Sequence, residues 1–241
     1  MRLTNLPWVT IEKIGGAELP SALMALGGRP PAPSWLSGLK FDGEVWAVDR
    51  GIDICRAAGI VPQMLIGDGD SATREGWLWA EERGVPIRRY QSDKDLTDFQ
   101  LALDIFRENN KNEVKRIFLT GAFGGRFDHL WSTAITFLNF SAPHVPFCAA
   151  DDKEGLLILR EGEEYSLSFQ RLPEAVSLIS FSEESRGVRL EGVRWPLDGA
   201  RLSYGFPYAV SNRLNDGRRA KISCESGRLG LYWAWSGKDI C

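Results

Sequence analysis

Short polar clusters that contain aspartate occur four times in the first half of the chain. Three of them follow hydrophobic runs, and the fourth opens a predicted helix. The clusters belong to the segments VWAVDRG (45–51), MLIGDGDS (64–71), SDKDLTD (92–98) and IFLTGAFGGRFDH (117–129). Their aspartates include Asp49, Asp68, Asp70, Asp98 and Asp128. Because neighbouring carboxylates repel one another unless cations lie among them, the pattern indicates a magnesium–phosphate site.

Asp68 and Asp70 have the spacing of two ligands for one hard cation. Residues two apart face the same side of a strand, and on the turn after a strand both can reach one Mg²⁺. Mg²⁺ leaves its other positions to water and phosphate oxygens. Ser71 can cap the following helix or bond a phosphate. Taken alone, the pair is equally compatible with an Asp-rich turn that binds nothing.

The cluster that ends at Asp98 lies at a helix start. Thr97 and Gln100 have the spacing of a capping box. Asp95 and Asp98 are three apart and so lie on neighbouring parts of one helix face. The helix dipole stabilises carboxylates at this position, which is a structural reason for finding them there. This cluster alone is therefore compatible with a cap as well as with a cation ligand.

The segment GAFGGRFDH (121–129) combines glycines with charged side chains just before a predicted helix. Its glycines permit a loop whose N–H groups point at an anion. Arg126 can bind phosphate oxygens with its forked guanidinium, and Asp128 or His129 can orient a substrate or bond a ribose. The segment is neither a Walker A loop nor a G-x-G-x-x-G fingerprint. A structural role for His129 at the helix start stays open.

A parallel sheet would bring these clusters together. The runs before them have the length and the Val, Ile and Leu content of buried strands. Helices are predicted at 52–58, at 73–83, from Thr97 and from about Asp128, strands also at 8–16 and 85–90, and a surface loop at 27–35. Alternating strands and helices imply a parallel sheet with both faces covered. Ligands bind beyond the carboxyl ends of such strands, where the aspartates are expected to converge.

From about residue 155 the helical periodicity disappears. Short β-type runs separated by turn residues follow: LLILR, EYSLSFQ, AVSLISFS, RGVRLEG, ARLSYGF, AKISCES and GLYWAW. This spacing predicts an antiparallel sandwich or jelly-roll-like domain. The expected fold is therefore α/β + all-β, with an N-terminal parallel α/β (Rossmann-like) domain over 1–150 and a C-terminal antiparallel β-sandwich domain over 151–241. Trp233 and Trp235 are expected in the core, and Trp195 is expected to be exposed for stacking on a flat ligand.

Composition narrows the class of protein further. A net charge of −3 leaves no basic footprint for nucleic acid, and the apolar stretches are too short to span a membrane. The first residues, MRLTNLPWVTIEK, lack the apolar core of a signal peptide. The cysteines show no C-x-x-C spacing, which favours reduced thiols in a cytoplasmic protein over a zinc site or a disulfide framework. They are Cys55, Cys148, Cys224 and Cys241. His144, between prolines, is expected to be structural.

The motifs together resemble the thiamine pyrophosphokinase (thiamine diphosphokinase) family. The first domain of that family has an A-D-G-G turn, then G-D-x-D-S, a T-D pair that opens a helix, and G-x-x-G-G-R-x-D-H. Here these motifs stand in the same order as VDRG, GDGDS, LTD and GAFGGRFDH. In the second half, GVRW (192–195) looks like the family's Gly-Leu-Lys-Trp strand, and Ser211-Asn212 looks like its Ser-Asn segment. The resemblance covers about 45–235 well and the first 40 residues weakly.

The resemblance implies an ATP-dependent and Mg²⁺-dependent transfer. The hydroxyethyl oxygen of thiamine attacks the β-phosphorus of ATP, which gives thiamine diphosphate and AMP. The family fold is a parallel α/β domain followed by a β-sandwich domain. The family assembles as a homodimer, with the active site at the subunit interface. No nucleic-acid or membrane partner is implied.

Roles for individual residues follow from the resemblance. Asp68, Asp70 and Asp98 would hold Mg²⁺ on the triphosphate, and Asp128 would position the reacting groups together with Arg126. The residues expected to line the nucleotide and its phosphates are Asp49, Gly51, Ser71, Thr97, Arg126 and His129. Trp195, Ser211 and Asn212 would contact thiamine from the partner subunit. Two positions depart from the family pattern: Arg50 replaces a glycine, and Gly69 replaces a hydrophobic or aromatic residue.

Other functions remain to be weighed against this one. A pterin-alcohol pyrophosphokinase of related fold would use the same acidic edge. A metal-dependent phosphohydrolase would release inorganic phosphate without an acceptor. A catalytically inactive regulator would bind nucleotide or thiamine without forming AMP.

Overall fold

The protein is described from a computed structural model, which covers residues 2–15, 19–39, 41, 43–91, 95–110, 116–140 and 147–235. The chain divides into two compact units. The α/β unit consists of Leu19–Ser37 and Phe41–Asp151, and the β unit consists of Met1–Glu18, Gly38–Lys40 and Asp152–Cys241. His144 and Cys241 lie outside the described residues.

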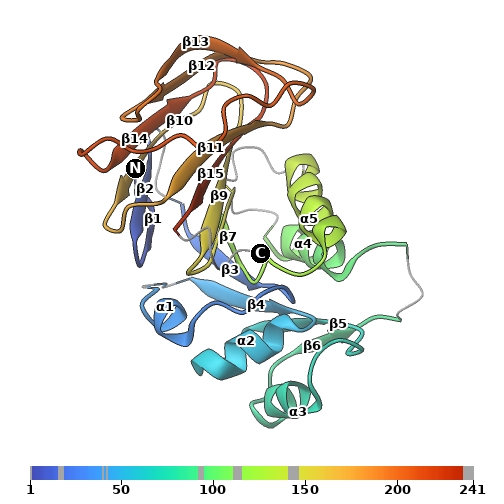
Figure 1. Ribbon diagram of the computed structural model, residues 1–241. Helices are drawn as coiled ribbons and strands as arrows, with labels where there is room; N and C mark the ends of the chain where they lie inside the picture. The colour runs from blue at the N-terminus through green and yellow to red at the C-terminus, as the bar shows by residue number, and fades with distance from the viewer. Residues whose placement is uncertain are drawn as a thin grey trace. The chain divides into compact units, whose positions relative to one another are not determined.

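Six strands of the α/β unit pair in parallel (Figure 1). They are β3 (Ser21–Ala25), β4 (Glu44–Val48), β5 (Met64–Gly67), β6 (Ile87–Arg89), β7 (Arg116–Thr120) and β8 (Phe147–Ala150). Their order is β8-β7-β3-β4-β5-β6. The order of the strands therefore reverses between β3 and β7, which creates a topological switch point at the carboxyl ends of these two strands.

Within the part of the chain that the structure describes, five helices connect or flank these strands. They are α1 (Pro33–Ser37), α2 (Gly51–Ala58), α3 (Arg74–Glu82), α4 (Asp98–Asn109) and α5 (Phe127–Asn139). Helix α2 packs on β3 and β4, whereas α4 packs on β4 and β5 from the opposite face (Figure 1). The helices predicted at 52–58, at 73–83, from Thr97 and from about Asp128 are thereby confirmed.

Local signals explain where these helices begin and end. Thr97 forms the predicted capping box with Gln100 at the start of α4, and Thr73 caps α3 by accepting from the Gly76 amide. Gly59 ends α2 in the left-handed conformation. One sequence expectation was wrong: the end of the predicted loop 27–35 forms the start of α1. Proline is favourable in the first turn of a helix, and Trp35 in α1 is buried.

The strands of the β unit pair antiparallel with one another in two sets. One has the order β1-β2-β10-β14-β12-β13, and β11, β15 and β9 pair side by side in the other. The strands are β1 (Arg2–Leu6), β2 (Val9–Lys13), β9 (Glu154–Leu159), β10 (Glu164–Phe169), β11 (Ala175–Ser180), β12 (Ser185–Glu191), β13 (Leu197–Leu202), β14 (Arg219–Ser223) and β15 (Leu229–Ala234). Phe169 of one sheet meets Trp233 of the other edge-to-face at 6.1 Å. The α/β plus β-sandwich fold class is confirmed.

The first two strands belong to the β unit, whereas the sequence pattern places them in the expected α/β domain over 1–150. Strand β2 pairs with β10, opposing Ile11 to Leu167. Val9 and Ile11 are fully buried, whereas the residues that follow each of them, Thr10 and Glu12, are not. This alternation is typical of an antiparallel strand with one wet face, not of a strand buried in a parallel sheet. Among the described residues, no helix is long and apolar enough to cross a membrane.

Candidate active site

Three aspartates meet at the carboxyl ends of β4 and β5. Asp49 follows β4, and Asp68 and Asp70 follow β5. Each can place one carboxylate oxygen within 4.8 Å of the others. The parallel pairing of β4 with β5 brings the two turns side by side, because Val48 lies opposite Ile66. This arrangement gives three oxygen ligands for a hard cation.

Asp49 is held rigidly at this edge. Its backbone is in the left-handed region, with φ at 50°, and its amide donates to the Ile66 carbonyl at 2.6 Å. Ser71 donates its hydroxyl proton to Oδ2 of Asp49. The other oxygen, Oδ1, is buried and has no hydrogen-bond partner among the described residues. A buried carboxylate oxygen without a partner is costly, and a bound cation would remove that cost.

The turn after β5 is tight. The amide of Asp70 donates to Oδ1 of Asp68 at 3.0 Å, and Gly69 between them has φ at +82°. A Cβ on Gly69 would lie 3.4 Å from the ring of Trp77 in α3. Gly69, which departs from the family pattern, thus has a left-handed backbone conformation that glycine adopts easily. Trp77 lies next to Gly69 and occupies the space alongside it.

The electrostatics of the cluster favour a bound cation. Burial raises the pKa of Asp49, and the nearby charges of Asp98 and Asp68 raise it further, against the Ser71 hydrogen bond. The pKa of Asp70 is also raised, first by its side-chain interaction with Asp68 and then by burial and neighbouring charges. Because a cation near the carboxylates opposes this repulsion, the donor set fits a divalent metal ion.

Asp98 lies close enough to act electrostatically on Asp49 and on Asp70. It stands in the first turn of α4, directly after the cap residue Thr97. The hydroxyl of Thr97 accepts from the Gln100 amide at 3.2 Å, which accounts for Thr97 as a cap. Asp95 is exposed, and residues 92–94 of the same cluster lie outside the described part of the chain.

Helix α2 begins directly at this site. Gly51 is buried, and a Cβ there would overlap the carbonyl oxygen of Ala25 in β3. Glycine is therefore required at position 51 because α2 approaches β3 closely there. Arg50 precedes the helix and makes no side-chain cap bond. The positive end of the α2 dipole lies next to Asp49, where an anionic ligand would be stabilised.

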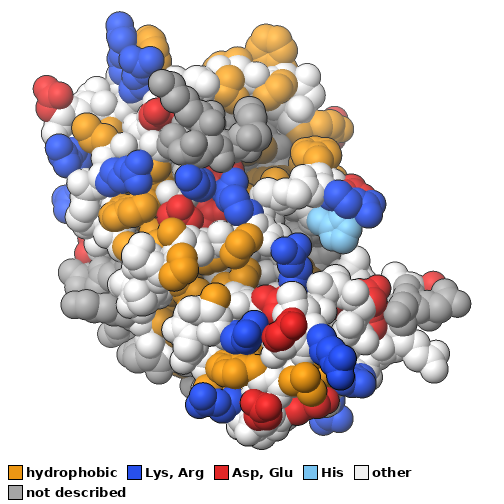
Figure 2. Space-filling view, turned by 60° about the horizontal axis from the view of Figure 1, so that its bottom comes forward, with side chains coloured by type: hydrophobic (Ala, Val, Ile, Leu, Met, Phe, Trp, Pro, Cys, Tyr) orange, Lys and Arg blue, Asp and Glu red, His pale blue; other side chains and the backbone are white. Residues whose placement is uncertain are grey.

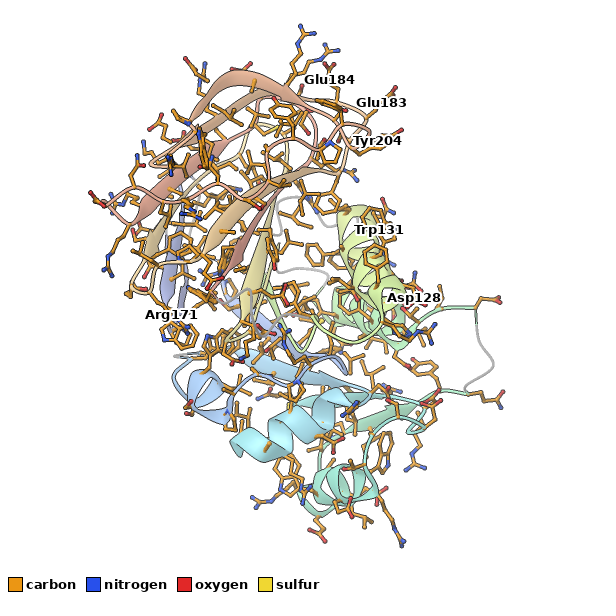
Figure 3. The ribbon with its side chains drawn as sticks, viewed as in Figure 1. Asp128, Trp131, Arg171, Glu183, Glu184 and Tyr204 are labelled. Atoms are coloured by element: carbon orange, nitrogen blue, oxygen red, sulfur yellow. The ribbon has the colours of Figure 1, made fainter. Side chains whose placement is uncertain are left out.

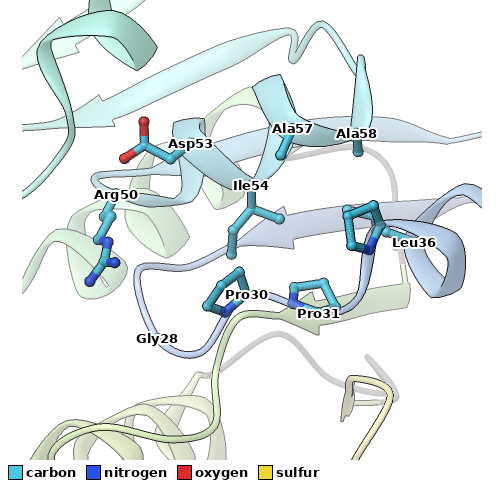
Figure 4. A pocket seen from close by; sticks show the side chains of 10 residues that line it. Gly28, Pro30, Pro31, Leu36, Arg50, Asp53, Ile54, Ala57 and Ala58 are labelled. Carbon is cyan, nitrogen blue, oxygen red and sulfur yellow. The ribbon is translucent and has the colours of Figure 1, made fainter.

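A cavity of about 200 Å³ lies between α2 and the segment that leads into α1 (Figure 4). One wall consists of Ile54, Ala57 and Ala58 of α2, and the opposite wall contains prolines of the segment 30–33. Arg50 also lines the cavity, at the start of the helix. The cavity is thus mostly apolar, with two charged residues in its lining, Arg50 and Asp53, at the start of α2.

The loop after β7 is shaped by glycine. Gly121, Gly124 and Gly125 have φ values of +67°, +74° and +73°. The loop pairs with the segment after β3, because the Gly28 amide donates to the Gly121 carbonyl at 2.7 Å and the Arg29 amide donates to the Phe123 carbonyl at 2.6 Å. Positive φ values of this kind are accessible to glycine without a steric penalty. The glycine loop therefore lies at the switch point between β3 and β7.

Arg126 and Asp128 form an exposed ion pair at the start of α5. The Arg126 side chain bonds both carboxylate oxygens of Asp128, at 3.1 and 2.5 Å. Arg126 lowers the pKa of Asp128 by hydrogen bonding. His129 is exposed, and its amide donates to Asp128. Asp128 and Trp131 both project from the surface of α5 (Figure 3). The Arg126 fork is thus engaged by Asp128, and a phosphate would compete with that carboxylate.

Two charged residues at this edge were missed by sequence reasoning. Arg29 follows β3, and its guanidinium bonds Oδ2 of Asp151, which follows β8. The Asp151 side chain is fully buried. Asp151 does end a short hydrophobic run, FCAAD, and this is the same signal that identified Asp49.

The residues expected to contact thiamine lie together in the β unit. Trp195 is 54% exposed, as expected, and the guanidinium of Arg194 lies 4.9 Å from its ring. Asn212 is buried, and its side chain bonds the backbone N–H and carbonyl of Trp195 at 3.2 and 2.7 Å. Ser211 is exposed with φ at 60°. Asn212 therefore holds Trp195 in place, and both Trp195 and Ser211 are exposed.

Other expectations for single residues can be resolved directly. Trp233 and Trp235 are buried and meet edge-to-face at 6.0 Å, which confirms their place in the core. Cys55, Cys148 and Cys224 are buried free thiols. Burial raises the pKa of the Cys55 thiol to about 12, so this side chain is no nucleophile at neutral pH.

Positive and negative side chains are mixed over the face shown in Figure 2.

Two family profiles match the chain. One is described as "Thiamin pyrophosphokinase, catalytic domain" and matches residues 42–149; the other is described as "Thiamin pyrophosphokinase, vitamin B1 binding domain" and matches residues 164–229. The chain belongs to the thiamine pyrophosphokinase family. The resemblance drawn from the motifs is confirmed, and so is the expected activity of a thiamine diphosphokinase that uses ATP. The pterin and regulator alternatives are not favoured.

Relatives of the thiamine pyrophosphokinase family align along most of the chain. The thiamine pyrophosphokinase of Bacillus subtilis (strain 168) is 29% identical over 180 residues, which are 74% of this chain and 82% of the relative. Thiamine pyrophosphokinase 1 of Oryza sativa subsp. japonica is 26% identical over 73% of this chain and 66% of its own length. The crystal structure of the Bacillus subtilis protein has a TM-score of 0.77 at 24% identity and covers 90% of this chain and 99% of that one. This last likeness concerns the fold.

Proposed function

We propose that the chain transfers the pyrophosphoryl group of ATP to thiamine at the acidic cluster of the α/β unit. The hydroxyl oxygen of thiamine forms a bond to the β-phosphorus, and the bond between that phosphorus and the oxygen shared with the α-phosphate breaks. Thiamine diphosphate and AMP are the products, and the hydroxyl proton is released. One observation supports this location above the others: three carboxylates lie within 4.8 Å, and one buried oxygen among them has no partner among the described residues.

Asp49, Asp68 and Asp70 would hold one divalent cation, with Asp98 as a further ligand or a nearby charge. Mg²⁺ bound there supplies charge neutralisation on the polyphosphate and on the leaving AMP. Asp49 is suited to bind the cation, because Ser71 occupies Oδ2 while the buried Oδ1 has no hydrogen-bond partner among the described residues. The family motifs pointed to Asp68, Asp70 and Asp98, and the geometry of the cluster adds Asp49 to this set.

The phosphates would lie between the start of α2 and the glycine loop. The N–H groups of the loop 121–125 offer donors at the carboxyl edge of the sheet, and the positive end of the α2 dipole lies at the same edge. Arg126 would leave Asp128 and bind phosphate oxygens when ATP is present. Asp128 would then be released for the reacting groups. Alignment and charge neutralisation account for the catalysis, with little covalent chemistry left to the protein.

The cavity beside α2 is the place that we assign to the adenosine part of ATP. Its apolar walls suit a flat base, and its volume of about 200 Å³ has room for the adenine ring. Arg50 lines the cavity and directly follows Asp49, so a nucleoside inside would have its phosphates next to the acidic cluster. Arg50, a departure from the family pattern, would thus bind the nucleotide.

Thiamine would stack on Trp195 in a homodimer, with the partner subunit supplying the β unit. The exposed ring of Trp195 and its immobilised backbone support a stacking role. Aromatic side chains at Tyr204, Phe206 and Tyr208 are also exposed, and exposed apolar side chains close together in a chain are typical of interfaces. A cytoplasmic location is in keeping with the three buried free thiols.

One assay tests the activity. Purified chain is incubated with ATP, Mg²⁺ and thiamine, and AMP and thiamine diphosphate are quantified. Equal amounts of both products are the expected result, with no AMP when thiamine or the metal is omitted. A hydroxymethyl-dihydropterin in place of thiamine should give no AMP. Release of inorganic phosphate without acceptor would show a phosphohydrolase instead, and ligand binding with no turnover would show a regulator.

A further inference from the structure

A buried ion pair joins the ends of two separate strands at the carboxyl edge of the α/β unit. The Nε and Nη2 atoms of Arg29 lie 3.0 and 2.6 Å from Oδ2 of Asp151. The Asp151 side chain is fully buried, and that of Arg29 is 21% exposed. The pair connects the segment after β3 with the end of β8, across 122 positions of sequence.

The same arginine contacts the glycine loop through its backbone and its Cβ. Its amide donates to the Phe123 carbonyl at 2.6 Å. A Cβ on Gly124 would lie 2.7 Å from the Cβ of Arg29, so the loop and the arginine are in direct contact. The neighbouring Gly28 amide bonds Gly121 in the same way. The side chain of Arg29 is therefore anchored by Asp151 at the end of β8. The main chain of Arg29 in turn holds the loop after β7.

Stability alone explains this pair poorly. The free energy needed to remove two charges from water is about as large as the free energy gained from their attraction. A buried ion pair therefore seldom stabilises a fold more than two apolar residues would. The glycine loop, however, has three residues at positive φ, and glycine has the widest conformational freedom of all residues. Amides in such a loop can bind phosphate effectively only if something outside the loop keeps them in place.

We propose that Arg29 is a positioning residue: anchored by Asp151, it holds the glycine loop 121–125 in the conformation that binds the polyphosphate of ATP. The inference rests on the proposed function, because that function places the polyphosphate at this loop. Arg29 acts through the loop amides and through the placement of Arg126. Thiamine binding, assigned to the β unit, does not depend on it.

The experiment compares three variants in steady-state kinetics with ATP, thiamine and Mg²⁺. Arg29→Met removes the charge but keeps the length of the side chain, and we expect it to raise the KM for ATP about tenfold or more while the KM for thiamine stays within about twofold. Arg29→Lys retains a charge that can reach Asp151, and its KM for ATP should lie nearer to wild type than that of Arg29→Met. The double variant Arg29→Met/Asp151→Leu replaces the pair with apolar groups and should recover thermal stability without recovering the KM for ATP.

A second ion pair provides a matched control. Lys13 and Glu163 in the β unit are also 2.6 Å apart, with side chains 16% and 9% exposed. Lys13→Met should lower the melting temperature and leave the KM for ATP unchanged. If the double variant regains both stability and the wild-type KM for ATP, the pair is merely structural and the proposal is wrong. The same holds if Arg29→Met raises both KM values equally.

The outcome does not depend on turnover alone. Binding of a fluorescent ATP analogue with Mg²⁺ is measured on the same proteins. Wild type that binds the analogue but forms no AMP would refute the proposed function, while weaker binding by Arg29→Met would still support the positioning role. Equal binding by wild type and Arg29→Met would refute that role even in an active enzyme.

Discussion

At the scale of single residues, Asp49 differs from the other aspartates of the cluster because one of its oxygens is both buried and without a bonding partner among the described residues. Its backbone has a φ of 50°, and Ser71, which lies in the turn after β5, occupies only one of its oxygens. Burial raises its pKa above the ordinary value of 3.8. The fold thus maintains an unfavourable carboxylate at this position, which is typical of functional sites.

Asp49→Asn tests whether the buried carboxylate of Asp49 destabilises the metal-free protein. Between pH 3.8 and the raised pKa of the folded protein, Asp49 is ionised in the unfolded chain and protonated in the folded one. The unfolded chain then binds fewer protons, so the contribution of Asp49 to stability falls as pH rises through this window and stays unfavourable at neutral pH. The metal-free Asp49→Asn variant should therefore melt higher than wild type at pH 7 and lose the increase in melting temperature on adding Mg²⁺ with ATP. A lower melting temperature in metal-free buffer would contradict the assignment.

Asp70→Asn tests the ligand role of the exposed member of the cluster. The substitution removes a charge but keeps the side-chain size, and Asp70 is exposed, so folding should be unchanged. We expect kcat to fall by at least about 10²-fold, as is usual when a group that stabilises developing charge is lost. Circular dichroism and melting curves provide the control for folding. Full activity would remove Asp70 from the metal site.

At the scale of elements, the carboxyl edge of the parallel sheet gathers functional groups from five strands. Segments after β3, β4, β5, β7 and β8 each contribute a charged side chain or backbone amides to this edge. The reversal of strand order between β3 and β7 separates the helices that follow these strands and leaves room at this edge. The helices that follow these strands therefore begin next to the place that we assign to the polyphosphate.

Thr97→Ala separates two roles at the start of α4. Because the hydroxyl of Thr97 accepts from the Gln100 amide, its loss should destabilise the protein by about 1 kcal/mol. If Thr97 only caps the helix, the KM for ATP stays at the wild-type value; if it also contacts the nucleotide, the KM rises. The structure favours the cap. Thr97→Ser keeps the hydroxyl and serves as the control for both stability and kinetics.

Ala57→Leu tests the cavity beside α2. The larger side chain would occupy space that we assign to adenosine, and leucine is a good helix former, so α2 should remain intact. We expect a rise in the KM for ATP of about tenfold, the cost of losing well-packed apolar contact, with little change for thiamine. Arg56→Leu, on the same helix but outside the cavity lining, is the matched control. Equal KM values in both variants would place adenosine elsewhere.

At the scale of the whole molecule, the question is whether one active site uses two subunits. The α/β unit carries the acidic cluster, and the β unit carries Trp195. Under the proposed homodimer, Asp70 of one chain and Trp195 of its partner serve the same site. Two inactive variants can therefore complement each other, which a site built within one chain does not allow.

Mixing Asp70→Asn with Trp195→Ala after joint refolding tests the shared site. Random pairing makes half of the dimers mixed, and each mixed dimer has one of its two sites intact, so about one quarter of the wild-type activity should return. Each variant refolded alone is the control, with Trp195→Ala assayed at thiamine concentrations well below saturation. Sedimentation of the mixture establishes the oligomeric state. No recovery from a mixture that forms dimers would show that each site lies within one chain.

Much of the site was predictable from sequence because its signals are local. Hydrophobic runs that are followed by polar clusters marked β4, β5 and β7, and the capping box marked α4. The motifs around Asp68, Asp70 and Arg126 identified the family. Strand length and helical periodicity depend on neighbouring residues, and so does a cap. Such features can be recognised without knowing what lies opposite them.

Other features were decided only by the tertiary structure. The pairing of Arg29 with Asp151, the packing of β2 on β10, and the use of Asn212 to hold Trp195 each join residues far apart in the chain. Sequence patterns report the period of burial along an element, but the partner of a buried charge or strand depends on how elements pack together. The sequence alone was therefore enough to identify the family and to single out the aspartates as candidate ligands. Only the packing of the elements decided which oxygen of Asp49 has no partner among the described residues and which arginine reaches the buried Asp151.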